Sequence, residues 1–213
     1  NLNRMSSSLI QEYFPELRVE QLKLLNQFAE LLTETNASLN LISRKSEDEI
    51  WVNHILHSLS IAKVVSFRKG DRVLDVGTGG GLPGIPLAII FPDTQFLLVD
   101  SVGKKIKAVR HIVESLGLKN VKCEHARAEE IPHRFQFVVS RAVAAFPKFT
   151  SWFHADPLIT DERPESGGLY YIKGGEFENE IMSLGLKFKT WQISDWFQEE
   201  FFETKKVVWV RLS

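Results

Sequence analysis

One glycine-rich stretch holds the residues that are best spaced for binding chemistry. Residues 72 to 90 read RVLDVGTGGGLPGIPLAII and contain Gly79-x-Gly81-x-x-Gly84, the spacing of a dinucleotide-binding turn. They also contain Asp75-x-Gly77-x-Gly79, the spacing of a different cofactor turn. Glycine allows the backbone to approach a ligand closely, because it has no side chain in the way. The stretch therefore predicts a cofactor loop, and the neighbouring side chains must decide which cofactor it holds.

Charged and cyclic side chains around the loop favour S-adenosylmethionine over NAD. Asp100 follows Gly84 by 16 residues and can accept hydrogen bonds from ribose hydroxyls, which both cofactors carry. Asp75 would add negative charge near the pyrophosphate of a dinucleotide, whereas it suits the sulfonium and ammonium groups of S-adenosylmethionine. Pro83 removes a backbone N–H from the turn that would hold phosphate. We therefore expect Gly79 and Asp100 to contact S-adenosylmethionine.

The apolar pattern predicts an α/β fold that would position this loop. The predicted strands cover residues 72–76, 95–100, 120–125, 137–140 and 169–174, and the predicted helices 84–91 and 104–117. Near-continuous apolar strands alternating with helices indicate a parallel sheet covered on both faces. Near the C-terminus, FKTWQISDWF and KKVVWVRL are β-rich, with no convincing helix between them. These two runs predict an antiparallel hairpin at one edge of the sheet.

Two amphipathic helices are predicted before the first strand. Residues 19–35 place leucine, phenylalanine and alanine at helical spacing. A second helix is predicted from the capping-box spacing of Ser46 and Glu49 and the apolar stripe that follows it. We expect these helices to form an N-terminal cap over residues 1–68, packed on a main domain over residues 69–213.

Composition limits the class of protein. The chain has 213 residues, of which 44% are hydrophobic and 25% charged, as is ordinary for a globular protein. Its one cysteine, Cys123, cannot form an intramolecular disulfide, which favours the cytoplasm. No apolar run is long enough to predict a membrane helix, and the scattered histidines predict no metal site. Because the net charge is -1, positive potential for a nucleic-acid partner must be local.

Further motifs give the chain a specific resemblance. VLDVGTGGGLPGIPLA is followed by LVDSVGKK, RAEE, VVSRAVA and YYIKGG. In these motifs the chain resembles the small-subunit rRNA guanine-N7 methyltransferases, also called the glucose-inhibited division protein B family, over about residues 20 to 175. LNLISR and NHILHSL resemble that family's helical cap. The resemblance implies a class I S-adenosylmethionine-dependent methyltransferase fold, Rossmann-like, with a mostly parallel seven-stranded sheet.

The same resemblance implies an activity and a set of cofactor contacts. The activity is transfer of a methyl group from S-adenosylmethionine to N7 of a guanine in the 530 loop of 16S rRNA. The contacts fall on Gly77, Leu82, Ala128, Glu129 and Arg141. Guanine N7 has a lone pair and carries no proton, so we expect no general base and name no catalytic residue. The expected partner is 16S rRNA or the small ribosomal subunit, and the expected state is a monomer.

RNA must be held by basic and aromatic side chains. The main candidates for RNA binding are Lys104, Lys105, Arg141 and Lys173, with Lys107, Arg110 and Lys148 as further basic residues. Phosphate contacts by such residues would make binding fall steeply with salt. Stacking on an unpaired base needs aromatic groups. Phe146, Trp152 and Phe153 are candidates for this role and equally plausible as core residues.

Two departures from the family pattern and three alternatives remain open. Gln136 and His57 stand where many members have aspartate. A methyltransferase acting on a small molecule would share the glycine loop but need an enclosed pocket. An NAD-dependent oxidoreductase would bind NADH in the same loop. An RNA-binding protein with an inactive methyltransferase fold would bind rRNA without consuming cofactor.

Overall fold

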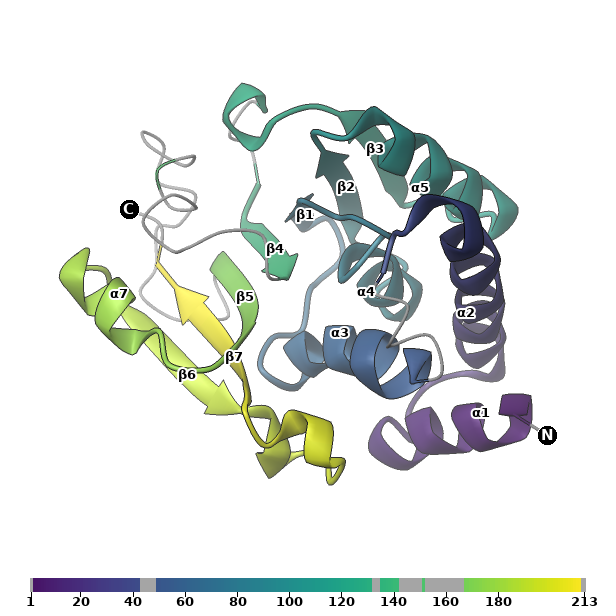
Figure 1. The fold of residues 1–213 in the computed structure, drawn as a ribbon, viewed down its shortest axis with the longest axis horizontal. Coiled ribbons are helices and arrows are strands. Elements are labelled where there is room, and N and C mark those ends of the chain that lie inside the picture. Colours follow the sequence, from purple (N-terminus) through teal and green to yellow (C-terminus); the bar gives the residue numbers. More distant parts are fainter. Residues whose placement is uncertain (1, 43–48, 132–134, 142–150, 152–166, 212–213) are drawn as a thin grey trace.

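A computed structural model gives the fold of the chain. It describes residues 2–42, 49–131, 135–141, 151 and 167–211. A seven-stranded sheet lies at its centre, in the order β3-β2-β1-β4-β5-β7-β6 (Figure 1). The strands are β1 Arg72–Val76, β2 Gln95–Asp100, β3 Val121–His125, β4 Phe137–Arg141, β5 Gly168–Gly174, β6 Phe188–Gln192 and β7 Lys205–Val210. All five strands of the predicted parallel sheet are therefore present, within one residue of their expected ends.

The direction of one strand separates this sheet from a dinucleotide-binding sheet. Strands β1 to β5 pair in parallel, whereas β7 is antiparallel to both β5 and β6. A dinucleotide-binding sheet has the order 3-2-1-4-5-6, with no reversed strand between the last two. The β6–β7 hairpin predicted at the sheet edge is thus confirmed, and β7 is the member that pairs with β5.

Helices surround the sheet and precede its first strand. The α-helices are α1 Leu2–Tyr13, α2 Val19–Leu39, α3 His57–Leu59, α4 Gly84–Ile90, α5 Gly103–Ser115 and α7 Glu178–Ser183. A π-helix, Trp51–Leu56, leads into α3, and a 3₁₀ turn, Ser60–Lys63, follows it. Shorter 3₁₀ turns cover Ala128–Glu130, Ile193–Asp195 and Glu200–Phe202.

Several of these helices differ from the sequence-based expectation. The expectation of only two helices before the first strand was wrong, because α1 precedes α2. The second expected helix is a mixture of π, α and 3₁₀ turns, and its predicted capping residue Ser46 lies outside the described residues. Helix α7, between β5 and β6, was also not predicted. The prediction that Gly117 caps the end of α5 was correct, since this glycine follows the helix with a φ of +66°.

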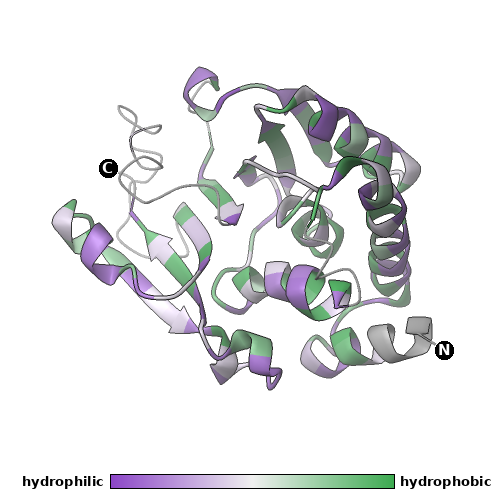
Figure 2. Cartoon of the chain, viewed as in Figure 1, coloured by the Kyte–Doolittle hydropathy of each residue, from purple (hydrophilic) through white to green (hydrophobic). Residues whose placement is uncertain are grey.

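The two faces of the sheet are covered by different parts of the chain. Alternate strand residues such as Phe96, Phe137 and Tyr170 join a core with helices α1 to α5. Residues on the opposite face, among them Leu74 and Tyr171, pack with the region of α7. Figure 2 shows the hydrophobic residues concentrated along the central strands. Because the central strands β1, β2, β4 and β5 are covered from both sides, their sequences are mostly apolar rather than alternating, whereas the edge strands β3 and β6 expose polar residues.

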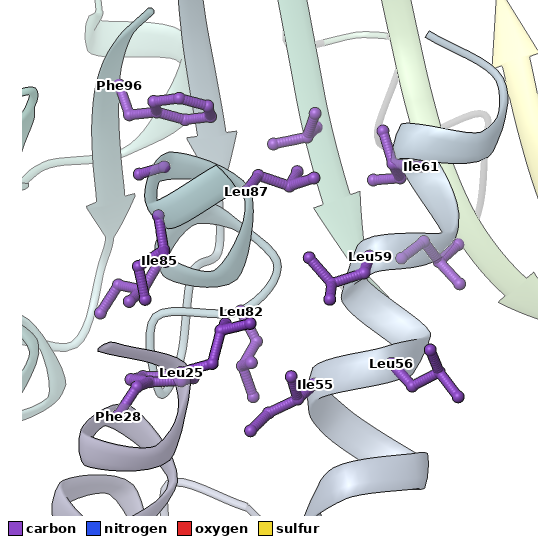
Figure 3. Close-up of a cluster of buried hydrophobic side chains, with 14 of the residues drawn as sticks. Leu25, Phe28, Ile55, Leu56, Leu59, Ile61, Leu82, Ile85, Leu87 and Phe96 are labelled. Atoms are coloured by element: carbon purple, nitrogen blue, oxygen red, sulfur yellow. The ribbon is translucent and has the colours of Figure 1, made fainter. Parts of the chain in front are cut away.

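The N-terminal helices and the glycine loop share one core. In Figure 3, Leu25 and Phe28 of α2 lie beside Leu82 and Ile85, with Ile55 of the π-helix on the other side. All five of these side chains are at most 3% exposed. The cap is therefore continuous in packing with the main sheet, although the boundary at residues 68 and 69 stays a prediction.

Candidate functional site

The turn after β1 takes backbone conformations that require glycine. Gly77, Gly79 and Gly81 have φ angles of +67°, +57° and +87°. Residues with a β-carbon rarely adopt this region, because the β-carbon approaches the carbonyl oxygen. Gly80 is needed for a different reason, since an added β-carbon would lie 2.9 Å from Leu32 Cδ1 of α2. The glycine run thus forms the loop and lets the N-terminal cap pack directly against it.

Asp75 supports the loop from beneath instead of facing a ligand. Its side chain is fully buried, and its Oδ2 accepts hydrogen bonds from Thr78 Oγ1 at 2.7 Å and from Gly84 N at 2.8 Å. Burial raises the pKa of this carboxyl to about 7, although the two hydrogen bonds lower it. The expectation that Asp75 lies beside the cationic groups of a cofactor was therefore wrong. Its carboxylate instead occupies the N-terminus of α4, where a dinucleotide-binding fold holds the pyrophosphate.

Asp100 ties the ends of two strands to the loop. Its Oδ2 accepts a hydrogen bond from Gly79 N at 3.0 Å, and its Oδ1 accepts one from Val102 N at 2.9 Å. The side chain is 8% exposed and forms part of the cleft. Each carboxylate oxygen has a second lone pair. Asp100 can therefore hold the loop and still accept hydrogen bonds from ribose hydroxyls.

A cleft of about 690 Å³ lies at the carboxyl ends of β1, β2, β3 and β4. This is the edge at which open α/β sheets bind ligands. Seven of its lining residues are those expected to contact the cofactor: Gly77, Gly79, Leu82, Asp100, Ala128, Glu129 and Arg141. The structure brings all seven together from four separate segments. Their role in binding stays a prediction.

Arg141 forms one side of the cleft at the end of β4. The side chain is half-buried, and its Nη1 donates a hydrogen bond to the backbone oxygen of Asn53 at 3.1 Å. Burial lowers the pKa of its guanidinium to about 10, and the Asp75 carboxylate opposes that change. Arg141 therefore remains positively charged at neutral pH. Its contact with Asn53 joins β4 to the π-helix.

The predicted RNA-binding lysines do not form one group. Lys105 lines the cleft, and Lys104 is exposed beside it at the start of α5. Lys173 lies at the end of β5 and forms an ion pair with Glu180 at 3.3 Å. Lys107 and Arg110 are exposed on α5. Lys148 and the aromatic candidates Phe146, Trp152 and Phe153 lie outside the described residues.

The cap supplies a cleft residue that sequence reasoning missed. Leu41, just after α2, lines the cleft. Its position is fixed because the buried Asn36 side chain accepts a hydrogen bond from Ile42 N at 2.7 Å. Asn40, between them, takes the left-handed conformation that ends α2, with a φ of +48°. The motif LNLIS carried this signal, since asparagine tolerates that conformation at a helix end.

The two departures from the family pattern have structural roles. Gln136 precedes β4, and its side-chain oxygen accepts a hydrogen bond from Arg72 N at 2.9 Å, which joins the starts of β4 and β1. An amide oxygen performs this task without a charge. His57 is buried and its ring packs at a steep angle against the rings of Phe201 and Phe202. It belongs to the packing between the π-helix region and the turn before β7.

The π-helix carries polar side chains into a buried position next to Arg141. Asn53 and His54 are 8% and 7% exposed. Burial lowers the pKa of His54 to about 3, and the positive charge of Arg141 lowers it further. The same two causes hold the pKa of His57 well below its usual value. Both imidazoles are therefore neutral at neutral pH.

In the described part of the chain, no group of three or more histidine, cysteine, aspartate or glutamate side chains could hold a metal ion. Within the same residues, no helix has the length and apolar character needed to cross a membrane.

Solved structures with the same fold support the sheet topology. An S-adenosylmethionine-dependent methyltransferase from Aquifex aeolicus matches 79% of this chain and 95% of its own, with a TM-score of 0.53 and 15% identity. Fibrillarin from Aeropyrum pernix, in complex with natively bound S-adenosylmethionine, matches 73% of both chains, with a TM-score of 0.52 and 13% identity. At these identities the similarity establishes the fold, a class I methyltransferase fold.

Sequence comparison identifies the family of the chain. A ribosomal RNA small subunit methyltransferase G from Cytophaga hutchinsonii is 46% identical over 204 residues, which cover 95% of this chain and 98% of that protein. The family model GidB, described as rRNA small subunit methyltransferase G, matches residues 21–207. With the glycine loop, the cleft and the reversed strand β7 in place, the chain belongs to the GidB family, rRNA small subunit methyltransferase G.

Proposed function

We propose that this protein transfers a methyl group from S-adenosylmethionine to N7 of a guanine in the 530 loop of 16S rRNA, acting as a monomer in the cytoplasm. The observation that carries the proposal is the cleft, where seven residues with cofactor-binding chemistry converge at the carboxyl ends of the parallel strands. Membership in a family described as rRNA small subunit methyltransferases supports rRNA as the substrate. The guanine N7 and its loop follow from the resemblance of the sequence motifs.

The residues of the cleft fit S-adenosylmethionine better than a dinucleotide. Asp100 and Glu129 offer acceptors for ribose hydroxyls and for the adenine amino group. Arg141 is a cation suited to the carboxylate of the methionine part. At the N-terminus of α4 the Gly84 N–H already donates to the Asp75 side chain, so this donor is not available to a pyrophosphate. The reversed strand β7 likewise differs from a dinucleotide-binding sheet.

The residues of this chain act by positioning. S-adenosylmethionine supplies an electrophilic methyl group bound to a sulfonium. Guanine N7 needs no deprotonation, so the chain must align the base, exclude water and accommodate charge that moves onto the base. The glycine backbone and Asp100 hold the cofactor side of the cleft. Arg141, at the end of β4, lines the same cleft.

The basic residues beside the cleft would hold the RNA backbone. Lys105 lines the cleft and Lys104 lies next to it, so both can approach a phosphate near the target nucleotide. Lys173 would have to exchange its ion pair with Glu180 for a phosphate contact. We therefore expect Lys104 and Lys105 to contribute more to RNA affinity than Lys173.

The test is methyl transfer from labelled S-adenosylmethionine to small ribosomal subunits that lack the modification, with the modified nucleotide mapped. Label at one guanine N7 of 16S rRNA is the expected result. Free 16S rRNA in a parallel reaction distinguishes naked RNA from the subunit as substrate. Absence of label at any guanine N7 would disprove the proposal, and label on a small molecule alone would replace it with a small-molecule methyltransferase.

A further inference from the structure

One residue of the N-terminal cap lines the cleft. That residue is Leu41, and in the described part of the chain every other lining residue lies within or after β1. Leu41 also touches the glycine loop. A β-carbon added to Gly80 would lie 3.4 Å from Leu41 Cβ, and one added to Gly79 would lie 4.0 Å from the Leu41 backbone oxygen. The segment that follows α2 is therefore in contact with the loop that borders the cleft.

A buried side chain holds Leu41 in this place. Asn36, in the last turn of α2, is 1% exposed, and its Oδ1 accepts a hydrogen bond from Ile42 N at 2.7 Å. Its backbone oxygen accepts another from Asn40 N at 3.2 Å. These two bonds fix the chain on either side of Leu41. Leu41 is 8% exposed and belongs to the core that α2 shares with the loop.

Hydrogen bonds to Asp100 set the order of residues along the cleft. Asp100 Oδ2 accepts from Gly79 N at 3.0 Å, and the Asp100 backbone oxygen accepts from Ala126 N at 3.3 Å. Ala126 precedes the 3₁₀ turn that carries Glu129. The cleft therefore runs from Leu41 and the glycine loop, past Asp100, to Glu129.

S-adenosylmethionine fits this order in one direction. The proposed function places the ribose hydroxyls at Asp100 and the adenine at Glu129. Adenine is attached to carbon 1′ of the ribose, whereas the methionine part is attached through sulfur to carbon 5′, on the other side of the ring. The methionine part therefore extends toward the glycine loop and Leu41. A leucine suits its methylene groups, because their contact removes apolar surface from water.

We propose that Leu41 contacts the methionine part of S-adenosylmethionine, and that Asn36 is the positioning residue that holds Leu41 there. This inference rests on the proposed function and adds the N-terminal cap to its cofactor site. Asp100 and Arg141 supply charged groups to the same cleft. Leu41 supplies the apolar contact and excludes water from the methylene groups.

The test compares ligands that differ in the amino-acid part alone. S-adenosylhomocysteine and 5′-methylthioadenosine share adenine, ribose and an uncharged sulfur, and only the first carries the amino-acid chain. Leu41→Ala should lower the affinity for S-adenosylmethionine and S-adenosylhomocysteine about 10-fold, because apolar contact is lost. The affinity for 5′-methylthioadenosine should stay at the wild-type value. Calorimetric titration measures the affinities, and circular dichroism gives the melting temperature of each variant.

A milder variant and a matched control accompany this change. Leu41→Val removes one carbon and keeps the core nearly filled, so it replaces Leu41→Ala if that protein does not fold. It should lower the affinity for S-adenosylhomocysteine about 3-fold. The control is Leu39→Ala, which truncates a half-buried leucine of α2 that does not line the cleft. This protein should bind all three ligands as the wild type does.

The positioning role of Asn36 has its own pair of variants. Asn36→Leu removes the acceptor of the Ile42 N–H. It should weaken S-adenosylhomocysteine and leave 5′-methylthioadenosine unchanged, as Leu41→Ala does. Asn36→Asp keeps an acceptor at this place and should recover most of the lost affinity. A purely structural role would lower the melting temperature without this difference between the ligands.

Three results would overturn the inference. Wild-type affinity for S-adenosylhomocysteine in both Leu41 variants would remove Leu41 from the cofactor site. An equal fall for 5′-methylthioadenosine would show that Leu41 only supports the loop as a whole. Unchanged affinities for all three ligands, with a raised KM for small ribosomal subunits, would assign Leu41 to the RNA.

The proposed function fails by a different result. A wild-type protein that binds S-adenosylmethionine but methylates no rRNA guanine would disprove the proposed acceptor. That result would leave the contact between Leu41 and the cofactor intact, because the binding measurements contain no RNA.

Discussion

The glycine loop and the π-helix differ in how many of their buried polar atoms have hydrogen-bond partners. On the loop side, both oxygens of Asp100 accept hydrogen bonds from backbone N–H groups, and Asp75 Oδ2 accepts from Thr78 and Gly84, so that only Asp75 Oδ1 lacks a partner in the described residues. On the π-helix side, Asn53 and His54 are as deeply buried, yet three of their atoms have no partner in the described part of the chain. The loop side is therefore preorganised for a ligand held mainly by backbone. In the π-helix, the unpaired atoms of Asn53 and His54 are buried and do not line the cleft.

Breaking the loop side should have the largest effect. Gly77→Asp places a side chain at a φ of +67° and adds a charge inside the cleft. We expect affinity for S-adenosylmethionine to fall at least about 100-fold, since strain and a misplaced carboxylate act together. The affinity is measured by calorimetric titration.

Gly185→Asp is the matched control for this change. Gly185 has a φ of +66° and nothing within 4 Å of an added β-carbon, and it does not line the cleft. The Gly185→Asp protein should have similar backbone strain and bind S-adenosylmethionine with normal affinity. Unchanged affinity in a folded Gly77→Asp protein would mean that the loop does not hold the cofactor.

Removing the support beneath the loop should lower stability. Asp75→Ala leaves the Gly84 N–H and the Thr78 hydroxyl without their shared acceptor. We expect a loss of about 2 to 4 kcal/mol in the free energy of unfolding, measured by urea denaturation. Thr78→Val removes only one of the two bonds and should lose less. Equal losses in the two variants would contradict the view that Asp75 fixes α4 to the loop.

The π-helix side should respond to pH. The pKa of His54 is lowered to about 3 in the folded protein, below its unfolded value of about 6.5. The unfolded chain therefore binds more protons between these values, and this contribution to stability is complete above pH 6.5 and lost as pH falls. Relative to His54→Gln, the wild-type protein should lose about 2 kcal/mol of unfolding free energy between pH 6.5 and pH 5.

The pH dependence of stability expected from Asp75 has the opposite sign to that expected from His54, and it serves as an internal check. Its pKa is raised to about 7 in the folded protein, so its stabilising contribution is complete below about pH 4 and is lost as pH rises toward 7. An Asp75→Asn protein should therefore be more acid-sensitive than the wild type over that range.

For His54, the contrary outcome is a stability that changes with pH in the same way in the wild type and in His54→Gln. That result would argue that His54 is not buried in its neutral form.

The smallest expected effect concerns RNA affinity at the rim of the cleft. Replacing Lys104 and Lys105 together by glutamine should weaken binding to the small subunit and reduce the salt slope by about 1 to 2, because each phosphate contact releases counterions. The control is Lys23→Gln with Lys122→Gln, two exposed lysines outside the cleft. Filter binding at several salt concentrations measures the affinity and the salt slope of each protein. If the Lys104/Lys105 variant has the same salt slope as the wild type, these lysines do not contact RNA phosphates.

Patterns close together in the sequence were predicted well. Strands β1, β2, β4 and β5 were found because they are largely buried and therefore mostly apolar, whereas the edge strand β3 exposes polar residues and was found from its place after the α5 helix and its glycine. The position of Gly117 followed from its place after an amphipathic run. Helix α7 was missed because its six residues include two glutamates and bury only Ile181. The sequence predicted an ordinary α-helix where the structure has a π-helix. A widened turn changes the hydrogen-bond register of the backbone but requires no distinctive residue types.

The sequence by itself determined the fold class, the glycine loop and the family, because these depend on residue types at fixed spacings along the chain. Tertiary structure alone decided that Asp75 faces away from the cleft, that Leu41 enters it, and that Asn53 meets Arg141 from 88 residues away. The physical reason is that side-chain direction and hydrogen-bond satisfaction depend on neighbours brought together by packing. Local sequence contains no record of those neighbours.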